Sequence, residues 1–412
     1  MKNENLVPKV RFKGFSDPWE QRKWADLIDI STDMVDPRDV EFSELPHVGP
    51  GNIEAFSGQL LDNVNTVEKD HLISGKFHFY KGNIIYGKIN PQLAKYIWAD
   101  FEGLSSADTY VLTTKSANIL NQGFIFYLLQ TRNFYKYSVS VSMRTGMPKI
   151  NRSELDAYSF LCPQSPEQIK IVQTIKILDD LIAANEDKLE QLKTLKKLMM
   201  QKIFSQKWRF KGFTDPWEQR KLGEMYYFKN GLNKGKEFFG FGTPIVNFVD
   251  VFHNRGLYAQ NLNGRVNLTE KEINNFRVHK GDIFFTRTSE TIEEIGFPSV
   301  MLSEPQDTVF SGFVLRGRSL EKPGQLVNIF KKYVFFTNAF RKEMVTKSSM
   351  TTRALTSGTA LSAMRVKFPL EATEQKKIGE LITRLDYLIA ANEDKLNQLK
   401  KLKKYLMQNM FV

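Results

Sequence analysis

Apolar residues recur at alternating spacings of four and three in two long segments, the heptad pattern of helices that pack along a seam. Each seam is interrupted by one Asn and one Lys, at the same two steps in both segments. The first seam comprises Ile171, Ile175, Leu178, Ile182, Asn185, Leu189, Leu192, Lys196, Met199 and Ile203; the second comprises Ile378, Ile382, Leu385, Ile389, Asn392, Leu396, Leu399, Lys403, Leu406 and Met410. We predict two long helices whose seams pack on each other, with Asn185 and Asn392 setting the register. The alternative is that each helix packs only on its own domain.

The two segments belong to a repeat of the whole chain. Residues 11–23 and 209–221 differ only at Ser16 and Thr214, and residues 181–197 match residues 388–404 at all but two positions. Between these segments the copies are less alike, although "KGNIIYGKI" (81–89) aligns with "KGDIFFTRT" (280–288). A period of about 200 residues is too long for a solenoid. We therefore predict a domain at 1–165, a helix at 166–207, a second domain at 208–372 and a second helix at 373–412.

The domain interiors read as mixed α and β. Short runs rich in β-branched and aromatic residues, "TYVLTT", "DIFFTRT" and "SGFVLRG", are typical of strands. The runs "GFIFYLLQTRNF" and "VNIFKKYVFFTNAF" carry apolar residues on one side, which predicts helices. The expected fold class is α+β, with two similar mixed domains and a pair of long helices.

The net charge indicates the class of binding partner, and the cysteine content indicates the cellular compartment. Lys and Arg exceed Asp and Glu by 58 to 46, a net charge of +12, which suits a polyanionic partner. The single cysteine, Cys162, forms no disulfide within the chain, so we expect a reducing, cytoplasmic compartment. The start, "MKNENLVPKV", lacks the apolar run of a signal peptide, and we expect no membrane span.

Motifs for a catalytic centre are weak. "FFGFG" (238–242) has the glycine spacing of an adenosylmethionine-binding loop, but no apolar strand precedes it. "NPQL" (90–93) has Gln92 where amino-methylating enzymes have a second Pro, and five scattered histidines do not form a zinc pattern. We predict no catalytic residue, no bound metal and no bound cofactor.

Polar loops with cations offer a different chemistry. Arg and Asn side chains pair with base edges, and Lys, Ser and Thr donate to phosphates. The predicted DNA-binding residues are Lys88, Asn90, Arg144 and Lys149 in the first domain, and Arg287, Ser289, Thr352 and Arg353 in the second. For any one of them the alternative is a solvated loop.

These features together resemble the specificity subunit of a type I restriction–modification enzyme. The resemblance lies in the repeated "GFTDPWEQRKLGE" opening, "KGDIFFTRT", "TGMPKINRSEL" and the twin helices, and it covers essentially the whole chain. It implies two target-recognition domains held apart by an antiparallel coiled coil, each reading one half of a split double-stranded DNA site. It also implies partners: two modification subunits that bring S-adenosylmethionine and methylate adenine, and restriction subunits that use ATP and Mg. The first domain departs from the pattern at "GNIIYGKI", which leaves its contacts there less defined.

Two rival functions make distinct predictions. A self-contained DNA methyltransferase would bind adenosylmethionine as an isolated chain. A coiled-coil scaffold with no DNA role would show no salt-dependent affinity for DNA.

Overall fold

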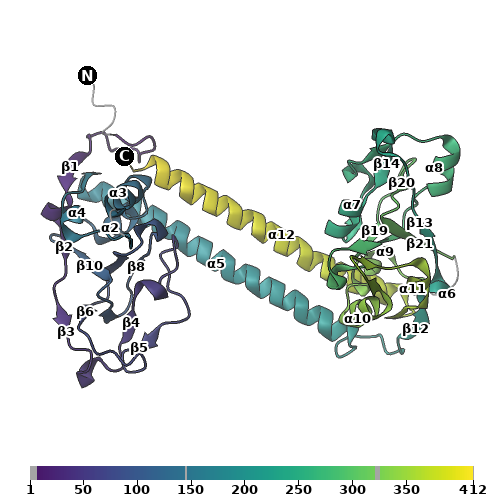
Figure 1. Ribbon diagram of the computed structural model, residues 1–412, viewed down its shortest axis with the longest axis horizontal. Coiled ribbons are helices and arrows are strands. Elements are labelled where there is room, and N and C mark those ends of the chain that lie inside the picture. Colours follow the sequence, from purple (N-terminus) through teal and green to yellow (C-terminus); the bar gives the residue numbers. More distant parts are fainter. Residues whose placement is uncertain (1–6, 144–145, 321–324, 412) are drawn as a thin grey trace. The chain divides into compact units, whose positions relative to one another are not determined.

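The computed structural model describes residues 7–143, 146–320 and 325–411, which form two compact units (Figure 1). Unit 1 comprises residues 1–186 and 394–412, and unit 2 comprises residues 187–393. Each unit therefore contains one α/β domain together with part of each of the two long helices, α5 (Ser165–Phe204) and α12 (Ala372–Asn409). None of the described helices has an apolar stretch long enough to cross a bilayer.

Unit 1 is built on a four-stranded sheet, a five-stranded sheet and a two-stranded pair. Their strand orders are β2-β10-β7-β8, β3-β6-β9-β4-β5 and β1-β11. The strands are β1 (Glu20–Lys23), β2 (Ile28–Ile30), β3 (Met34–Val35), β4 (Pro46–Val48), β5 (Asn65–Thr66), β6 (Lys76–Phe79), β7 (Ile84–Gly87), β8 (Tyr96–Trp98), β9 (Gly103–Ser105), β10 (Thr109–Thr114) and β11 (Ser159–Cys162). The short α-helices are α1 (Trp24–Leu27), α2 (Gln122–Leu128), α3 (Arg132–Ser142) and α4 (Arg152–Asp156).

Unit 2 repeats this plan with different strand pairings. Its sheets have the orders β13-β21-β17-β19-β15, β16-β14-β20, β18-β23-β22 and β12-β24. The strands are β12 (Glu218–Lys221), β13 (Tyr226–Asn230), β14 (Phe239–Val246), β15 (Gly256–Leu257), β16 (Arg265–Val266), β17 (Ile283–Thr286), β18 (Thr288–Ser289), β19 (Pro298–Met301), β20 (Val309–Phe310), β21 (Val314–Ser319), β22 (Ser349–Met350), β23 (Ala354–Leu355) and β24 (Arg365–Phe368). The short α-helices are α6 (Leu222–Met225), α7 (Phe248–His253), α8 (Glu270–Phe276), α9 (Asn328–Val334), α10 (Asn338–Lys347) and α11 (Gly358–Ala363).

The strand-like and helix-like runs form the elements expected of them, with one difference. Each helical run is divided into two helices, α2 and α3 in unit 1 and α9 and α10 in unit 2. The reason is a threonine at the same step of both runs: the hydroxyls of Thr131 and Thr337 accept hydrogen bonds from the backbone N–H groups of Phe134 and Phe340. A threonine hydroxyl used in this way starts a new helix.

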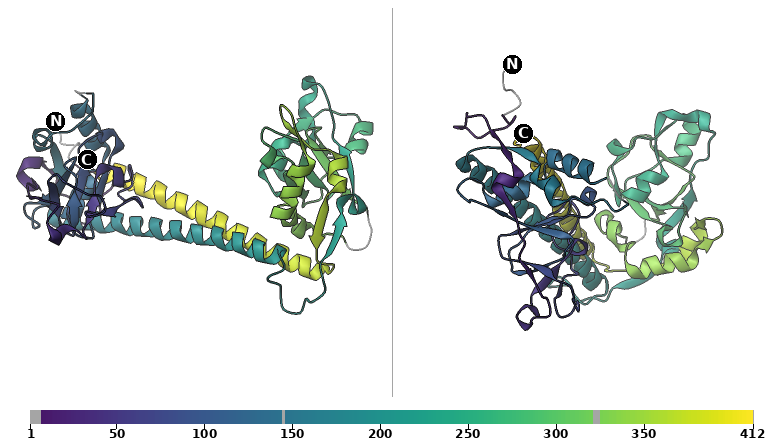
Figure 2. Two further views of the ribbon diagram at one scale, coloured as in Figure 1. Left: turned by 60° about the horizontal axis from the view of Figure 1, so that its bottom comes forward. Right: turned by 60° about the vertical axis from the view of Figure 1, so that its left-hand side comes forward.

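The long helices bury the predicted seam. Every seam position of α5 and α12 is buried or half-buried, whereas most residues between them are exposed. In unit 1, Lys403 pairs with Asp179 at 2.6 Å and Lys400 pairs with Glu186 at 2.6 Å. The residue numbers rise along one helix as they fall along the other, so the helices lie antiparallel within this unit (Figure 2).

Unit 2 contains the matching pair of contacts. Lys193 lies 2.8 Å from Glu393, and Lys196 pairs with Asp386. These are the repeat equivalents of the two ion pairs in unit 1. The helices therefore pair antiparallel in this unit too, with the same register.

The repeated opening segment is tied to the start of the helix that follows its domain. Arg11 donates through two nitrogens to Glu167 at 2.7 and 2.8 Å, and Arg209 donates to Glu374 at 2.9 and 2.7 Å. Both carboxylates are 2% exposed. A bidentate buried pair fixes both segments in one geometry, which explains why the opening and the helix are repeated together.

The far end of each helix enters a core made by the other copy of that opening segment. In unit 1, Phe411 packs on Trp19 and Phe124, with ring centroids 6.4 and 5.2 Å away. In unit 2, Phe204 packs in the same way on Trp217 and Phe330, at 6.1 and 5.7 Å. Each unit is thus closed by aromatic residues from distant parts of the sequence.

Replacing both seam asparagines with leucine is expected to raise the melting temperature by roughly a few degrees and to permit slipped helix pairings, because a polar residue in a seam trades stability for register. Asn185 and Asn392 are both 6% exposed, and the amide of Asn185 donates to the carbonyl of Leu181 in its own helix at 2.6 Å. Thermal unfolding and the spacing of the DNA target would be measured together. A more stable variant with an unchanged target spacing would show that these residues are not needed for register.

Candidate nucleic-acid interface

Three of the four cation and amide positions predicted in the first domain lie together in unit 1. Ile89, between Lys88 and Asn90, forms a β-bridge with Lys149, and the backbone N–H of Asn90 donates to the carbonyl of Pro148 at 2.7 Å. Asn90 adopts the left-handed conformation, with φ of 49°, which asparagine tolerates better than most residues. The fourth position, Arg144, lies outside the described residues.

Lys88 is held at the end of β7. Its backbone N–H donates to the carbonyl of Asp108 at 3.0 Å, and its carbonyl accepts from the N–H of Ile150 at 3.0 Å. Its ammonium lies 5.4 Å from the centre of the Tyr110 ring. Partial burial lowers the pKa of Lys88, as does the nearby charge of Lys149, while Asp108 opposes the shift. An anion that supplied negative charge here would relieve this electrostatic cost.

Arg287 occupies the equivalent place in unit 2. Its backbone N–H donates to the carbonyl of Phe313 at 3.0 Å, and its carbonyl accepts from the N–H of Thr356 at 3.1 Å. These bonds match those of Lys88 one for one, so the alignment of residues 81–89 with 280–288 holds at the level of the backbone. Both domains therefore place a cation at the end of a central strand.

The remaining predicted residues of the second domain differ in their suitability as DNA contacts. Thr352 and Arg353 are exposed, and Arg353 pairs with Glu290 at 3.1 Å. Ser289 is only 7% exposed, and its hydroxyl accepts from the N–H of Thr291 in a tight turn. We therefore reassign Ser289 from contacting DNA to shaping the turn that follows β18.

Two exposed side chains beside these cations were not predicted from the sequence. Asp108 neighbours Lys88, and Phe313 neighbours Arg287. The sequence contains a signal that could have identified them. Extending the alignment of the two copies by one strand aligns the short loop before "TYVLTT" with the short loop before "VLRGRS".

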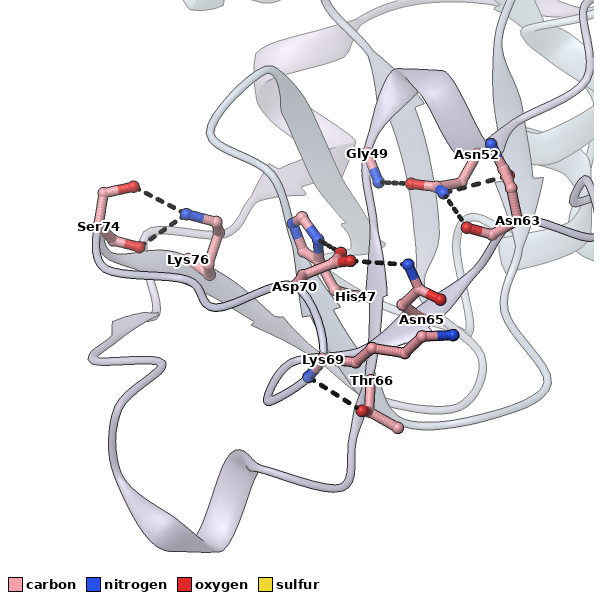
Figure 3. Close-up of polar contacts among 10 residues, drawn as sticks. All are labelled: His47, Gly49, Asn52, Asn63, Asn65, Thr66, Lys69, Asp70, Ser74 and Lys76. Atoms are coloured by element: carbon pink, nitrogen blue, oxygen red, sulfur yellow. Dashed lines mark hydrogen bonds and ion pairs between the residues drawn. The ribbon is translucent and has the colours of Figure 1, made fainter.

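Unit 1 also contains a network of polar side chains around Asp70 (Figure 3). His47 on β4 contacts Asp70 at 2.8 Å, and Asn65 donates to the same carboxylate at 2.8 Å. The hydrogen bond from His47 is the main reason that the pKa of Asp70 is lowered. The equivalent of His47 in unit 2 is the buried Ile245. The two domains thus share a backbone frame but differ in the side chains that fill it.

A cleft of about 890 Å³ in unit 1 lies between the domain and the paired helices. Three of its cations already have partners: Lys403 contacts Asp179, Lys400 contacts Glu186, and Lys176 lies over the Trp98 ring. The charges of Lys403 and Lys400 are therefore compensated by carboxylates within the cleft. Among the described residues there is no group of three or more His, Cys, Asp or Glu suited to hold a metal ion.

Comparison with known proteins finds similarity to one family. Residues 16–194 match the family model of the type I restriction modification DNA specificity domain. The chain is 32% identical over 160 residues to the type I restriction enzyme EcoDI specificity subunit of Escherichia coli, and 29% identical over 174 residues to the HindI specificity subunit of Haemophilus influenzae. These matches cover 39% of the chain in each case but only 34% and 35% of the two relatives, so they span about a third of each relative's length.

Longer but weaker similarity extends over nearly the whole chain. A putative type I restriction enzyme MjaX specificity subunit of Methanocaldococcus jannaschii is 23% identical over 438 residues, which covers 98% of this chain and 95% of that protein. The crystal structure of a type I restriction–modification S subunit from M. genitalium has the same fold, with a TM-score of 0.62 at 15% identity over 99% of both chains.

Proposed function

We propose that the chain is a specificity subunit of a type I restriction–modification enzyme, as its similarity to such subunits supports. In this proposal it reads a bipartite double-stranded DNA target as a non-catalytic subunit, with one half-site read by each unit. The observation that carries the proposal is the matched placement of Lys88 and Arg287. Two domains with one backbone frame and different side chains are what reading two different half-sites requires. The net charge of +12 supplies the sequence-independent part of the affinity.

The partners in this proposal are two modification subunits and, in the full enzyme, restriction subunits. Support comes from exposed leucines on the two long helices, which recur at equivalent positions with similar exposure in both copies. Leu181 and Leu388 are 41% and 40% exposed, and Leu195 and Leu402 are both 45% exposed. Exposed apolar residues at equivalent positions of both copies suit two copies of one partner. S-adenosylmethionine, ATP and Mg would be bound by those partners.

The rival functions have less support. "FFGFG" lies largely within strand β14, which pairs with β16 and β20, so it is not the loop after an apolar strand that an adenosylmethionine site needs. A scaffold with no DNA role gives no reason for two equivalent cations beside exposed polar loops. Adenosylmethionine binding by the isolated chain, or DNA affinity that is independent of salt, would favour a rival over our proposal.

Replacing Lys88 or Arg287 with alanine is expected to weaken binding to the cognate DNA by about 1–3 kcal/mol and to relax specificity in one half-site only. Each residue belongs to a different unit, so the two variants are expected to affect different half-sites. Binding of the full chain to duplexes with each half-site randomised in turn would measure both effects.

Lys81→Ala and Lys280→Ala are the matched controls. Both lysines are exposed, and they precede the strands β7 and β17 that Lys88 and Arg287 follow. Their replacement removes the same charge from the other end of each strand. We expect little change in sequence preference for either control. Unchanged preference in both Lys88→Ala and Arg287→Ala would contradict the assignment of this surface.

A further inference from the structure

The loops that precede β10 in unit 1 and β21 in unit 2 have the same hydrogen-bonded frame. The backbone N–H of Ser106 donates to Val48 at 2.9 Å, and that of Ser311 donates to Val246 at 2.9 Å. The hydroxyl of each serine accepts from the N–H two residues later: Ser106 from Asp108 at 3.2 Å, and Ser311 from Phe313 at 3.3 Å.

The strand that follows closes each loop in the same way. The N–H of Thr109 donates back to Ser106 at 3.0 Å, and the N–H of Val314 donates back to Ser311 at 3.1 Å. The frame thus fixes the third loop residue against the cation of its own domain. These backbone bonds are matched in the two units, although unit 2 also has a bond from the N–H of Gly312 to the carbonyl of Leu232 at 2.8 Å. The difference in chemistry between the loops lies in their side chains.

The two units have side chains of opposite chemistry at this third loop position. Unit 1 has Asp108, an exposed carboxylate that acts on the charge of Lys88. Unit 2 has Phe313, which is 64% exposed. Leaving an aromatic side chain in water forgoes the favourable free energy of burying its apolar surface, and a polar residue at the same place would forgo much less. Its position beside a cation that is kept in both copies indicates a surface that is covered when DNA is bound.

We propose that Asp108 and Phe313 are specificity-determining residues at one equivalent position of the two domains, an inference that rests on the proposed function. The carboxylate of Asp108 accepts a hydrogen bond from the exocyclic amine of a cytosine in the first half-site. The ring of Phe313 contacts the C5-methyl group of a thymine in the second half-site. Lys88 and Arg287 provide the common cation beside each base contact.

The test uses the full chain and double-stranded DNA in which one half-site at a time is randomised. Asp108→Ala is expected to lose roughly tenfold of its discrimination at one position of the first half-site, and Phe313→Ala the same at one position of the second. Deoxyuridine in place of the thymine, which removes only the methyl group, is then expected to weaken the wild-type chain but not Phe313→Ala. Phe241→Ala is the matched control, because Phe241 is 55% exposed in the same unit but lies on the separate strand β14.

The outcomes separate this inference from the proposed function. Unchanged preference at every position in both variants, with Lys88→Ala and Arg287→Ala still impaired, would overturn the inference and leave the proposed function standing. A wild-type chain with no sequence preference would overturn the proposed function itself. Equal sensitivity of the wild type and Phe313→Ala to deoxyuridine would refute the methyl contact.

Discussion

Lengthening both long helices by four residues, after Leu189 and after Leu396, is expected to widen the gap between the two half-sites by one or two base pairs while leaving both half-site sequences unchanged. Four residues add about 6 Å to a helix. Successive base pairs are about 3.4 Å apart along the duplex. An insertion of four is close to one turn, so it perturbs a heptad seam locally without destroying it.

The insertion points are chosen so that the ion pairs between the two helices are kept. Insertion after Leu189 and Leu396 leaves Lys193 with Glu393 in unit 2 and Lys400 with Glu186 in unit 1, since both members of each pair stay on the same side of the inserted residues. Insertions after Lys193 and Lys400 are also equivalent in the repeat. They would, however, separate the members of both pairs by about one turn.

The target gap would be read from the methylated adenines in a genome that expresses the lengthened chain in place of the original. The control is the insertion after Leu189 alone, which makes the helices unequal and is expected to abolish sequence-specific methylation. An active double insertion that still methylates only the original spacing would exclude a role for the helices as a spacer.

Replacing Glu374 with alanine is expected to destabilise unit 2 by about 3 kcal/mol, because it leaves the guanidinium of Arg209 without its carboxylate in a largely buried site. Glu374 is 2% exposed and also lies 3.4 Å from the indole N–H of Trp217. The pKa of Arg209 is raised chiefly by its hydrogen bond to Glu374, which agrees with a charged pair. The matched change in unit 1 is Glu167→Ala, with Arg11 as the group left unpaired.

Denaturant unfolding, followed separately for the two units, would measure these losses. Glu20→Ala is the control, because its ion pair with Arg22 is exposed and is expected to contribute less than about 1 kcal/mol. Replacing Arg209 and Glu374 together with methionine is expected to recover much of the loss, since no charge is then buried alone. A loss for Glu374→Ala no larger than that for Glu20→Ala would show that the buried pair does not hold the opening segment to the helix.

Local pattern and internal repetition were enough to predict much of the architecture. The heptad spacing identified both long helices, because burial along a helix repeats with its turn and leaves a period in the sequence. The expected helices at 166–207 and 373–412 correspond to Ser165–Phe204 and Ala372–Asn409. The alignment of "KGNIIYGKI" with "KGDIFFTRT" likewise identified Lys88 and Arg287 as equivalent, because a shared backbone frame conserves strand length and turn position.

Only the tertiary structure decided which side chains meet. The pairing of Arg11 with Glu167 joins residues 156 positions apart, and no periodicity reports a contact at such a separation. Ser289 resembled an available hydroxyl in the sequence, but the turn after β18 buries it. Asp108 and Phe313 share no chemistry, so residue type alone did not link them. Their equivalence follows from matched backbone hydrogen bonds, which depend on how strands pair in space and not on the side chains that a sequence displays.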